Sequence, residues 1–506
     1  MFNKVLYIKY HTTALKLGIT AFKTIPFKSE KSFINGQWVS AQSGKNLDVF
    51  NPATGTLVGT VPDMNTADTQ IAIDSASKAF ETWKNTTAKE RSQILRRWYS
   101  LMLENQNTIA EIMTAESGKS LQESNGEVIY GNSFVEWFSE LARQVRGEVI
   151  PSSDRSKKIL IHHQPIGVVG LITPWNFPHA MITRKASAAL SVGCTVVVKP
   201  GEDTPLTAVE IMKCAEKAGF PPGVINLLTS SRENTAEIGR LLCKSPLVAG
   251  ISFTGSTTVG KILYSQCAPG IKRIGLELGG NASFIVYKSA NLDKAVEGAL
   301  TSKFRNCGQT CVASNRFLIQ ADIFDAFVDK LVAKVKNLKI GNGFDEGTQI
   351  GPLINEAQLH KVSNFVEDAV SKGAKVLVGG KPASHIGKLF YEPTVLSNIT
   401  SNMLVYSEEV FGPVISLIHF NTEEESLHIA NSNDVGLASY FYSEDISQVF
   451  RVSHNLEVGM VGVNVGLISA AEAPFGGIKQ SGLGREGSHL GIEDYTYIKY
   501  TCLGNL

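Results

Sequence analysis

The sequence predicts an α/β protein that contains a parallel, doubly wound sheet and a second α/β domain. Helical and strand patterns alternate along most of the chain, several strands are short and apolar, and the alternation restarts after Glu277. A chain of 506 residues with 43% hydrophobic and 19% charged residues is long enough for two or three domains. No internal repeat or low-complexity segment interrupts the alternation.

The first series of elements begins with helical spacing over residues 66 to 83 and 88 to 114. Two short strands, 167 to 174 and 194 to 200, each end at a proline and flank a helix over 178 to 193 that Gly193 closes. The following segments are predicted as helix, strand, helix and strand: residues 206 to 220, 223 to 229, 233 to 246 and 248 to 256. Such strand-helix-strand units are typical of parallel sheets.

The second series predicts strands over 283 to 287 and 316 to 320, with helices over 292 to 304 and 323 to 338. It indicates a further α/β domain.

Composition excludes several classes of function. The net charge of +1 gives no field that would attract nucleic acid. No run of eighteen apolar residues is present, so we expect no membrane-spanning helix. Seven scattered cysteines are too few for a disulfide scaffold and favour a reducing compartment. Cys307 and Cys311 have metal-ligand spacing, but no second pair accompanies them, so we expect no metal site.

The first 29 residues contain five lysines and no acid, with apolar residues between the charges. This composition fits a mitochondrial transit peptide, which would place the protein in the matrix, and it equally fits a disordered basic tail on a cytoplasmic protein. Folded sequence is expected to begin near residues 32 to 39.

Two reactive side chains stand in unusual contexts. Cys311 lies in the run FRNCGQTCVASNR, and Glu277 lies between apolar residues and a Gly-Gly pair in LELGGN. A thiol nucleophile and a carboxylate base suggest covalent catalysis. Taken alone, Cys311 also fits a small core residue, and Glu277 also fits a helix or loop acid.

A glycine-containing run, FTGSTTVGK at 253 to 261, ends a predicted strand and opens a helix. Its backbone N–H groups could approach a phosphate at the helix N-terminus. The run nearly matches a P-loop, but Ile262 replaces the hydroxyl residue that would hold magnesium. A dinucleotide needs no such hydroxyl, whereas a plain strand-helix turn would need no ligand at all.

Seven segments in order resemble the aldehyde dehydrogenases: PWNFP, KPGEDTP, FTGSTTVG, LELGGN, GQTC, EEVFGP and PFGGIKQSGLGREG. The resemblance runs from about residue 30 to the end. It implies a Rossmann-type NAD-binding domain over 30 to 142 and 166 to 279, and a catalytic domain over 280 to 475. It also implies a small oligomerisation hairpin from residues 143 to 165 and 488 to 506, and hence a homo-oligomer, either a tetramer or a dimer.

The resemblance also implies a mechanism. Cys311 would attack an aldehyde to give a thiohemiacetal and then a thioester, with Glu277 as the base for the thiol or for the water that cleaves the thioester. Asn176 and the Cys311 backbone N–H would stabilise the oxyanion. Asn176 taken alone also fits a turn former.

The cofactor implied is NAD, with NADP as the alternative. The residues implied in binding it are Trp175, Lys199, Pro200, Gly201, Glu202, Gly255, Ser256, Thr257, Thr258, Val259, Gly260, Glu409 and Phe411. The Glu202 carboxylate would accept hydrogen bonds from the ribose hydroxyls and repel a 2′-phosphate, which favours NAD. The same carboxylate also complements a helix dipole.

Within the family, MITRK, KFRNCGQTC and GLIS look most like the members that oxidise succinate semialdehyde, a step in 4-aminobutanoate degradation. The substrate carboxylate would then meet Arg184, Arg305 and Ser469. Relatives with a redox switch have a second cysteine two residues after the nucleophile, where this chain has Ala313. Another ω-carboxylated or aliphatic aldehyde, and a non-catalytic role on the same scaffold, are the alternatives.

Overall fold

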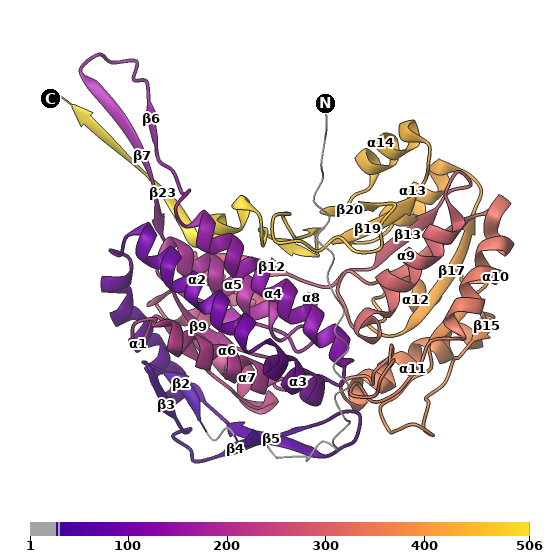
Figure 1. The fold of residues 1–506 in the computed structure, drawn as a ribbon. Helices are drawn as coiled ribbons and strands as arrows, with labels where there is room; N and C mark the ends of the chain where they lie inside the picture. Colours follow the sequence, from indigo (N-terminus) through magenta and orange to yellow (C-terminus); the bar gives the residue numbers. More distant parts are fainter. Residues whose placement is uncertain (1–26, 29–30, 505–506) are drawn as a thin grey trace, which may run out of the picture.

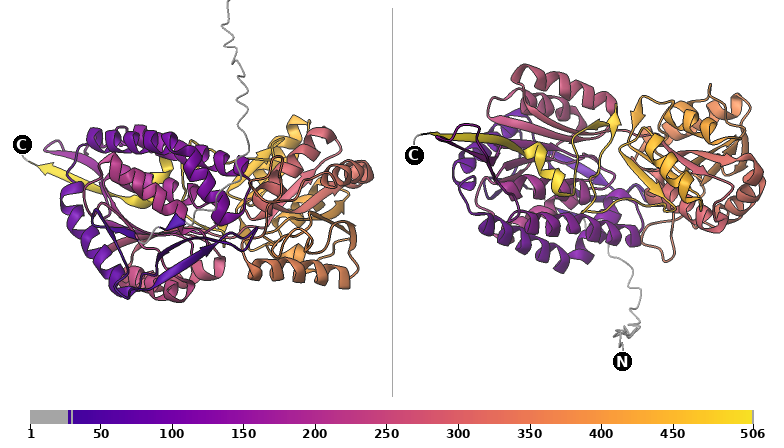
Figure 2. Two further views of the ribbon diagram at one scale, coloured as in Figure 1. Left: turned by 60° about the horizontal axis from the view of Figure 1, so that its bottom comes forward. Right: turned by 90° about the horizontal axis from the view of Figure 1, so that it is seen from above.

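The computed structural model describes residues 27–28 and 31–504, and it forms two lobes that face each other across a cleft (Figure 1). The first lobe holds a six-stranded sheet and the second a seven-stranded sheet. Figure 2 shows the two lobes side by side, with the last part of the chain crossing back from the second lobe to the first. The basic segment over residues 1 to 29 lies, except for residues 27–28, outside the described residues.

The first sheet has the strand order of a doubly wound dinucleotide fold. Its strands lie in the order β10 (Ile225–Leu227), β9 (Thr195–Lys199), β8 (Val168–Ile172), β11 (Val248–Thr254), β12 (Arg273–Glu277) and β22 (Gly482–Leu483). The first five are parallel, and β22 is antiparallel. In chain order the five parallel strands read 3-2-1-4-5, so the topology reverses between β8 and β11.

Helices cover both faces of this sheet (Figure 1). They are α1 (Thr66–Trp83), α2 (Ala88–Glu104), α3 (Gln106–Ser117), α4 (Leu121–Leu141), α5 (Ala180–Val192), α6 (Pro205–Ala218), α7 (Arg232–Lys244) and α8 (Thr257–Cys267). Capping boxes begin α1, α2 and α4, where Asn65, Thr87 and Ser120 each exchange hydrogen bonds with the acid three residues later.

The helical spacing over residues 88 to 114 is divided between two helices rather than one. The structure has two helices that meet at Asn105, whose backbone leaves the helical region (φ −100°, ψ 13°). The Asn105 side chain donates to the Leu101 carbonyl at 2.7 Å and so competes with the backbone for the last turn of α2. Apolar spacing continues across this break and therefore concealed it.

The second sheet lies in the order β15 (Lys375–Val378), β16 (Thr394–Ser397), β17 (Val414–Phe420), β14 (Ser314–Gln320), β13 (Ala282–Val286), β19 (Ala438–Tyr442) and β20 (Met460–Val463). All neighbours are parallel except β15 with β16. Its helices are α9 (Leu292–Phe304), α10 (Phe324–Val335), α11 (Glu356–Ser371), α12 (Leu404–Ser407), α13 (Glu423–Asn431) and α14 (Ile446–Asn455).

A three-stranded antiparallel sheet projects from the first lobe at the upper left of Figure 1. It pairs β23 (Thr496–Gly504) with β7 (Lys157–Pro165), and β7 with β6 (Glu148–Ile150). Smaller sheets join β1 (Phe27–Lys28), β5 (Leu57–Pro62) and β4 (Asn46–Phe50), then β2 (Ser32–Ile34) with β3 (Gln37–Val39), and β18 (Val435–Gly436) with β21 (Ile478–Lys479). Within the described residues, no helix has the length and apolar character needed to cross a membrane.

Candidate active site

The residues singled out from the sequence gather where the parallel strands of the first sheet end. Asn176 follows β8, Glu202 follows β9, Ser256 follows β11 and Glu277 is the last residue of β12. The second lobe contributes Cys311 from the connection between α9 and β14, and Glu409 from the connection between α12 and β17. Ligands of open α/β sheets bind at this edge, beside the reversal of strand order.

The loop that carries Cys311 has an unusual backbone. A short 3₁₀ segment, Arg305–Gly308, contains Asn306, Cys307 and Gly308 in left-handed conformations (φ 51°, 55° and 74°). A Cβ on Gly308 would lie 2.2 Å from the Gly412 carbonyl oxygen, so only glycine fits there. The non-glycine residues in this conformation store strain, which is common beside reactive groups.

The Gly-Gly pair after Glu277 lets the two lobes approach the nucleophile closely. A Cβ on Gly280 would lie 2.7 Å from the Cys311 carbonyl oxygen, and one on Gly279 would lie 3.0 Å from Glu409 Oε2. The Gly280 N–H donates to Glu409 Oε1 at 3.2 Å. The glycines of LELGGN therefore place Glu277 beside both Cys311 and Glu409.

Glu277 belongs to a buried ionic cluster. Its Oε2 atom accepts from Arg184 Nη2 at 3.2 Å, and the Arg184 Nε is paired with Glu486. Glu486 also pairs with Lys185, whose Nζ donates to Ser252 Oγ at 3.1 Å. Arg184 and Lys185 are at most 1% exposed. Two cations and two carboxylates thus form a neutral cluster in which each charge has a partner.

The Cys311 thiol and the Glu277 carboxyl are directly coupled. Both side chains are buried, both line the smaller cavity described below, and each acts on the pKa of the other. Burial raises the pKa of Glu277, although Arg184 opposes that rise. Burial, and then the charge of Glu277, raise the pKa of Cys311 well above its ordinary value, again against Arg184. A carboxyl with a raised pKa is a better base, and a thiol with a raised pKa needs such a base.

Asn176 sits where an oxyanion donor could act. Its Nδ2 donates to the Gln309 carbonyl at 3.0 Å, and its own carbonyl accepts from Lys119 Nζ at 2.7 Å and from Asn306 Nδ2 at 2.9 Å. Because an amide nitrogen has two hydrogens, one remains for a ligand. These bonds fix Asn176 to the loop that carries Cys311.

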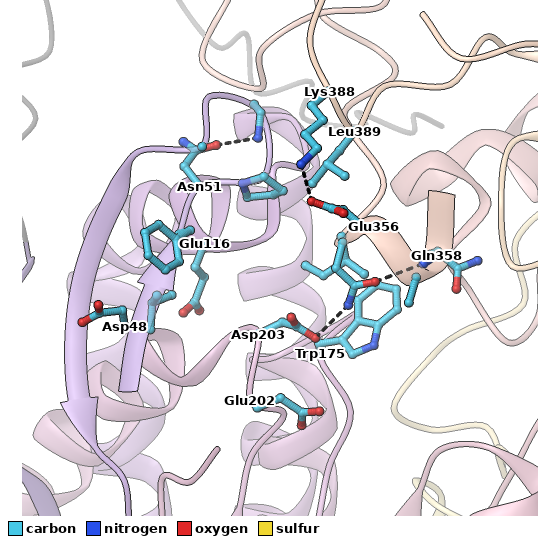
Figure 3. A pocket seen from close by; sticks show the side chains of 18 of the residues that line it. Asp48, Asn51, Glu116, Trp175, Glu202, Asp203, Glu356, Gln358, Lys388 and Leu389 are labelled. Atoms are coloured by element: carbon cyan, nitrogen blue, oxygen red, sulfur yellow. Dashed lines mark hydrogen bonds and ion pairs between the residues drawn. The ribbon is translucent and has the colours of Figure 1, made fainter. Parts of the chain in front are cut away.

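A cavity of about 1400 Å³ lies between the lobes, and a smaller one of about 210 Å³ extends to Cys311. Figure 3 looks into the larger cavity, which is lined from both lobes by residues that include Trp175, Glu202, Asp203, Glu356 and Gln358. Trp175, Ser256, Gln358 and Lys361 line both cavities. The hydroxyl of buried Thr254 in the smaller cavity has no hydrogen-bond partner in the described part of the chain. An elongated ligand that ends beside the thiol fits this space.

The predicted phosphate loop opens helix α8. Ser256 is the N-cap, and its hydroxyl accepts from the Val259 N–H at 3.4 Å. Thr257 and Thr258 occupy the first turn, where N–H groups and the helix dipole favour an anion. Gly255 and Gly260 have little space for a Cβ, which would lie 2.4 Å from the Phe253 ring and 2.5 Å from Leu278.

Two aromatic rings and one acid meet beside the smaller cavity. Trp175 and Phe411 make an edge-to-face contact at 5.6 Å, and Phe411 has a left-handed backbone (φ 56°) held by Gln358 Nε2, which donates to its carbonyl at 2.8 Å. Burial raises the pKa of Glu409 to about 7, against the charge of Lys361. The resemblance placed Glu409 and Phe411 among the cofactor-binding residues, and both lie beside other residues of that set.

Lys199 and Glu202 form an ion pair with 3.5 Å between Nζ and Oε2. Lys199 is 2% exposed, and burial lowers its pKa. Gly201 packs against the backbone of Trp175, since a Cβ there would lie 2.8 Å from the Trp175 nitrogen. At the end of β9, Glu202 lines the large cavity, and Lys199, Pro200 and Gly201 connect it to the strand.

The three predicted substrate residues converge on a residue that the sequence did not single out. Tyr130 of α4 lies close enough to Arg184, Arg305 and Ser469 for all three to lower the pKa of its hydroxyl, against the larger effect of burial, which raises it. Lys185 and Glu486 were likewise missed. Lys185 lies in the segment MITRK and Glu486 lies in the segment GREG, so both belong to segments that resemble the family. Nothing in the α4 sequence indicates that Tyr130 would reach the site.

Comparison with known proteins agrees with this geometry. Residues 38–501 match the pattern of the aldehyde dehydrogenase family. The chain belongs to the aldehyde dehydrogenase family. The mitochondrial succinate-semialdehyde dehydrogenase of Rattus norvegicus is 55% identical over 94% of this chain and 90% of its own length. A glutarate-semialdehyde dehydrogenase of Pseudomonas aeruginosa is 52% identical over 94% of this chain and 98% of its own length.

Among solved structures, a succinate-semialdehyde dehydrogenase from Burkholderia pseudomallei superposes with a TM-score of 0.92 at 50% identity, covering 94% of this chain and 98% of that one. The α/β fold of the family and the membership predicted from the seven segments are therefore confirmed. The protein is an oxidoreductase of a family whose enzymes use NAD or NADP and act on small aldehydes.

Replacing Cys311 with alanine should abolish turnover while leaving NAD affinity nearly unchanged, because the thiol forms the covalent bond but is a small part of the cavity wall. Cofactor reduction measures turnover, and titration calorimetry measures NAD affinity. Cys307→Ala is the control, since this buried thiol is used in no step, and it should keep most activity. Substantial turnover by Cys311→Ala would contradict the assignment of the nucleophile.

The raised pKa of Cys311 predicts a steep pH dependence of its alkylation. Only the thiolate reacts, so the rate with iodoacetamide should rise roughly tenfold per pH unit between about pH 7 and 9 without levelling off. The measurement requires a Cys502→Ser background, because Cys502 is the exposed cysteine among the described residues. A plateau below pH 8 would mean that the thiol pKa is low in the free enzyme.

Proposed function

We propose that the protein oxidises succinate semialdehyde to succinate with NAD, through a thioester on Cys311. The observation that supports this most strongly is that a thiol coupled to a carboxyl base lies between the cofactor-sized cavity and a cluster of cationic and hydroxyl side chains. The relatives named above act on aldehydes that carry a second, anionic end. Oxidation of glutarate semialdehyde, one methylene longer, is the second candidate.

In the first step the Cys311 thiol loses its proton. Glu277 accepts it, and the sulfur adds to the aldehyde carbon to give a thiohemiacetal with a negative oxygen. The second N–H of Asn176 and the Cys311 backbone N–H stabilise that oxygen, and one such donor is typically worth on the order of 10² to 10³ in rate.

NAD, when bound, supplies the acceptor for the hydride that leaves the carbon. A thioester to Cys311 remains. Glu277 releases to solvent the proton that it took from the thiol, and it then takes a proton from a water molecule as the water oxygen attacks the thioester carbonyl. The C–S bond breaks, the thiolate leaves, and the acid formed ionises to succinate. Arg184 keeps Glu277 oriented toward the sulfur in both proton transfers.

In this proposal the two lobes have different roles. The first lobe binds the dinucleotide through the ends of β8, β9 and β11, and the second supplies Cys311. Glu202 would receive the ribose hydroxyls, with Lys199 holding its carboxylate in place. This assignment favours NAD over NADP.

The projecting sheet of β6, β7 and β23 is proposed to join subunits of a homo-oligomer. Val149, Ile498 and Tyr500 are each at least 66% exposed on it, an arrangement that favours burial against another chain. The basic segment over residues 1 to 29 and the mitochondrial relatives support a matrix location, where the reaction would serve 4-aminobutanoate degradation.

The proposed activity is tested by steady-state kinetics on a panel of aldehydes with NAD and, separately, NADP. Succinate semialdehyde with NAD should give the highest kcat/KM, ahead of glutarate semialdehyde and well ahead of butanal, which has the same chain length without the carboxylate. A higher value for butanal would contradict recognition of an anionic end. A higher value for glutarate semialdehyde would favour the second candidate.

Glu202→Ser should increase the use of NADP relative to NAD, because it removes the carboxylate that would repel a 2′-phosphate and frees Lys199 from its ion pair. The ratio of kcat/KM values for the two cofactors measures the change. Glu210→Ser is the control, because Glu210 lies on α6, the helix that follows the Glu202 segment, and does not line the cavity. An unchanged ratio would show that residues other than Glu202 determine the preference between NAD and NADP.

Arg305→Gln should lower kcat/KM for succinate semialdehyde by about ten- to a hundred-fold, since it removes a charge-assisted hydrogen bond, and should affect butanal little. Arg184→Gln should lower the rate with both aldehydes, because it also leaves Glu277 and Glu486 without a buried partner. Equal losses on both aldehydes for Arg305→Gln would exclude a direct role in binding the carboxylate.

A further inference from the structure

A second buried ion pair, outside the cluster that contains Arg184, lies against the backbone of Asn176. Lys119 Nζ donates to Glu127 Oε2 at 2.5 Å, and each of these two side chains is 1% exposed. Lys119 lies in the turn between α3 and α4, and Glu127 lies within α4. A buried ion pair contributes little net stability, because removing both charges from water is costly. No step of the mechanism proposed above uses either residue, so the pair needs another explanation.

The ion pair holds both ends of the segment from Asn176 to Ala180. Lys119 Nζ donates to the Asn176 carbonyl at 2.7 Å. At the other end, Glu127 Oε1 accepts from the His179 N–H at 2.9 Å and from the Ala180 N–H at 3.3 Å. His179 is the N-cap of α5, and its own side chain makes no capping hydrogen bond, so Glu127 caps this helix instead.

The side chain of Asn176 has few hydrogen bonds that could orient it. It donates to the Gln309 carbonyl at 3.0 Å, and within the described residues its buried Oδ1 atom has no hydrogen-bond partner. The direction of the second Nδ2 hydrogen, which would meet the oxyanion, therefore depends on where the Asn176 backbone is held. The donors to that backbone carbonyl are Lys119 Nζ and, at 2.9 Å, Asn306 Nδ2.

The start of α4 also holds the loop that carries Cys311. The Asn306 N–H donates to Glu123 Oε1 at 2.7 Å, and Asn306 has a left-handed backbone that needs such support. The Asn176 carbonyl thus lies between one donor from each lobe, Lys119 from the first and Asn306 from the second. Because Glu127 neutralises Lys119, the ion pair acts on Asn176 through geometry rather than through net charge.

We propose that Lys119 and Glu127 are positioning residues of the oxyanion site. Lys119 fixes the Asn176 backbone, and Glu127 fixes both Lys119 and the first turn of α5, so that the remaining Nδ2 hydrogen of Asn176 points at the thiohemiacetal oxygen over Cys311. This inference rests on the thioester mechanism proposed above, but it does not depend on which aldehyde is the substrate, because the oxygen that becomes negative belongs to the aldehyde group. A displacement of about 1 Å at a reacting group can cost on the order of 10² in rate.

The double variant Lys119→Met/Glu127→Gln tests this proposal. It removes both charges together, so no buried charge is left unpaired, and the amide oxygen at position 127 can still accept from the His179 and Ala180 N–H groups. The expected result is a loss of about tenfold or more in kcat/KM, equal for succinate semialdehyde and butanal, with NAD affinity and melting temperature nearly unchanged.

The matched control is Lys213→Met/Glu210→Gln. It makes the same two substitutions in an ion pair on α6 whose residues line neither cavity of the site. This variant should keep the kcat/KM of the unmodified protein for both aldehydes.

Two further measurements distinguish positioning of Asn176 from a general structural role. Once Asn176→Ala has removed the amide, its position no longer matters, so adding Lys119→Met/Glu127→Gln should then cost less than about twofold. Alkylation of Cys311 by iodoacetamide, in the Cys502→Ser background, displaces iodide and forms no oxyanion. Its rate should therefore be the same with and without the ion pair.

The outcomes separate the inference from the proposed function. If the unmodified protein reduces NAD with no aldehyde of the panel, the proposed function fails. If it oxidises aldehydes and the double variant keeps its kcat/KM, the inference is overturned and the function stands. Losses that multiply with that of Asn176→Ala, or slower alkylation of Cys311, would make the ion pair merely structural and would also overturn the inference.

Glu127→Gln alone keeps the test decisive if the double variant folds poorly. It retains Lys119 as a donor to Asn176 but removes the partner that holds Lys119 in place, so we expect a smaller loss in kcat/KM that disappears in the Asn176→Ala background. A loss that persists without the Asn176 amide would overturn the inference.

Discussion

The buried ion pairs of Arg184 and Lys185 with Glu277 and Glu486 hold the active site together. They join helix α5, the end of β12 and the segment that follows β22, which are far apart in the sequence. Removing charges from water is costly, and deleting one member of such a cluster typically costs about 3 to 5 kcal/mol because a buried charge is left unpaired. Glu277 can act beside Cys311 because this cluster fixes its carboxyl and moderates its pKa.

Most of the fold could be predicted from local patterns in the sequence. Alternating apolar strands and amphipathic helices predicted a parallel sheet, and short connections left few alternatives to a doubly wound arrangement. The pattern did not predict the strand order or the return of β22 to the edge of the first sheet. Pairing between distant strands depends on packing between segments that are far apart in the sequence, and no short segment shows it. The break at Asn105 was missed because a side chain, not a change in apolar spacing, ends α2.

The candidate site, like the fold, could be predicted from the sequence only in part. Cys311 and Glu277 could be singled out because each lies in a segment that resembles the family, whereas either residue taken alone also fits a structural role. Tyr130 could not, because a tyrosine on an amphipathic helix looks like any other core-facing aromatic until α4 is packed against α5. The two arginines also looked alike in the sequence. Only their partners distinguish the neutralised Arg184 from the accessible Arg305.

The return of the chain to the first lobe has a consequence for biosynthesis. β22, Glu486 and β23 all come from the last 25 described residues or so, yet they complete a sheet, an ionic cluster and a hairpin begun more than 200 residues earlier. While the ribosome is still adding the second lobe, the first has an open sheet edge and two buried cations without Glu486. Such contacts of high sequence separation form late, and open edges favour aggregation. We therefore expect the first lobe to be prone to aggregation until β23 has been synthesised.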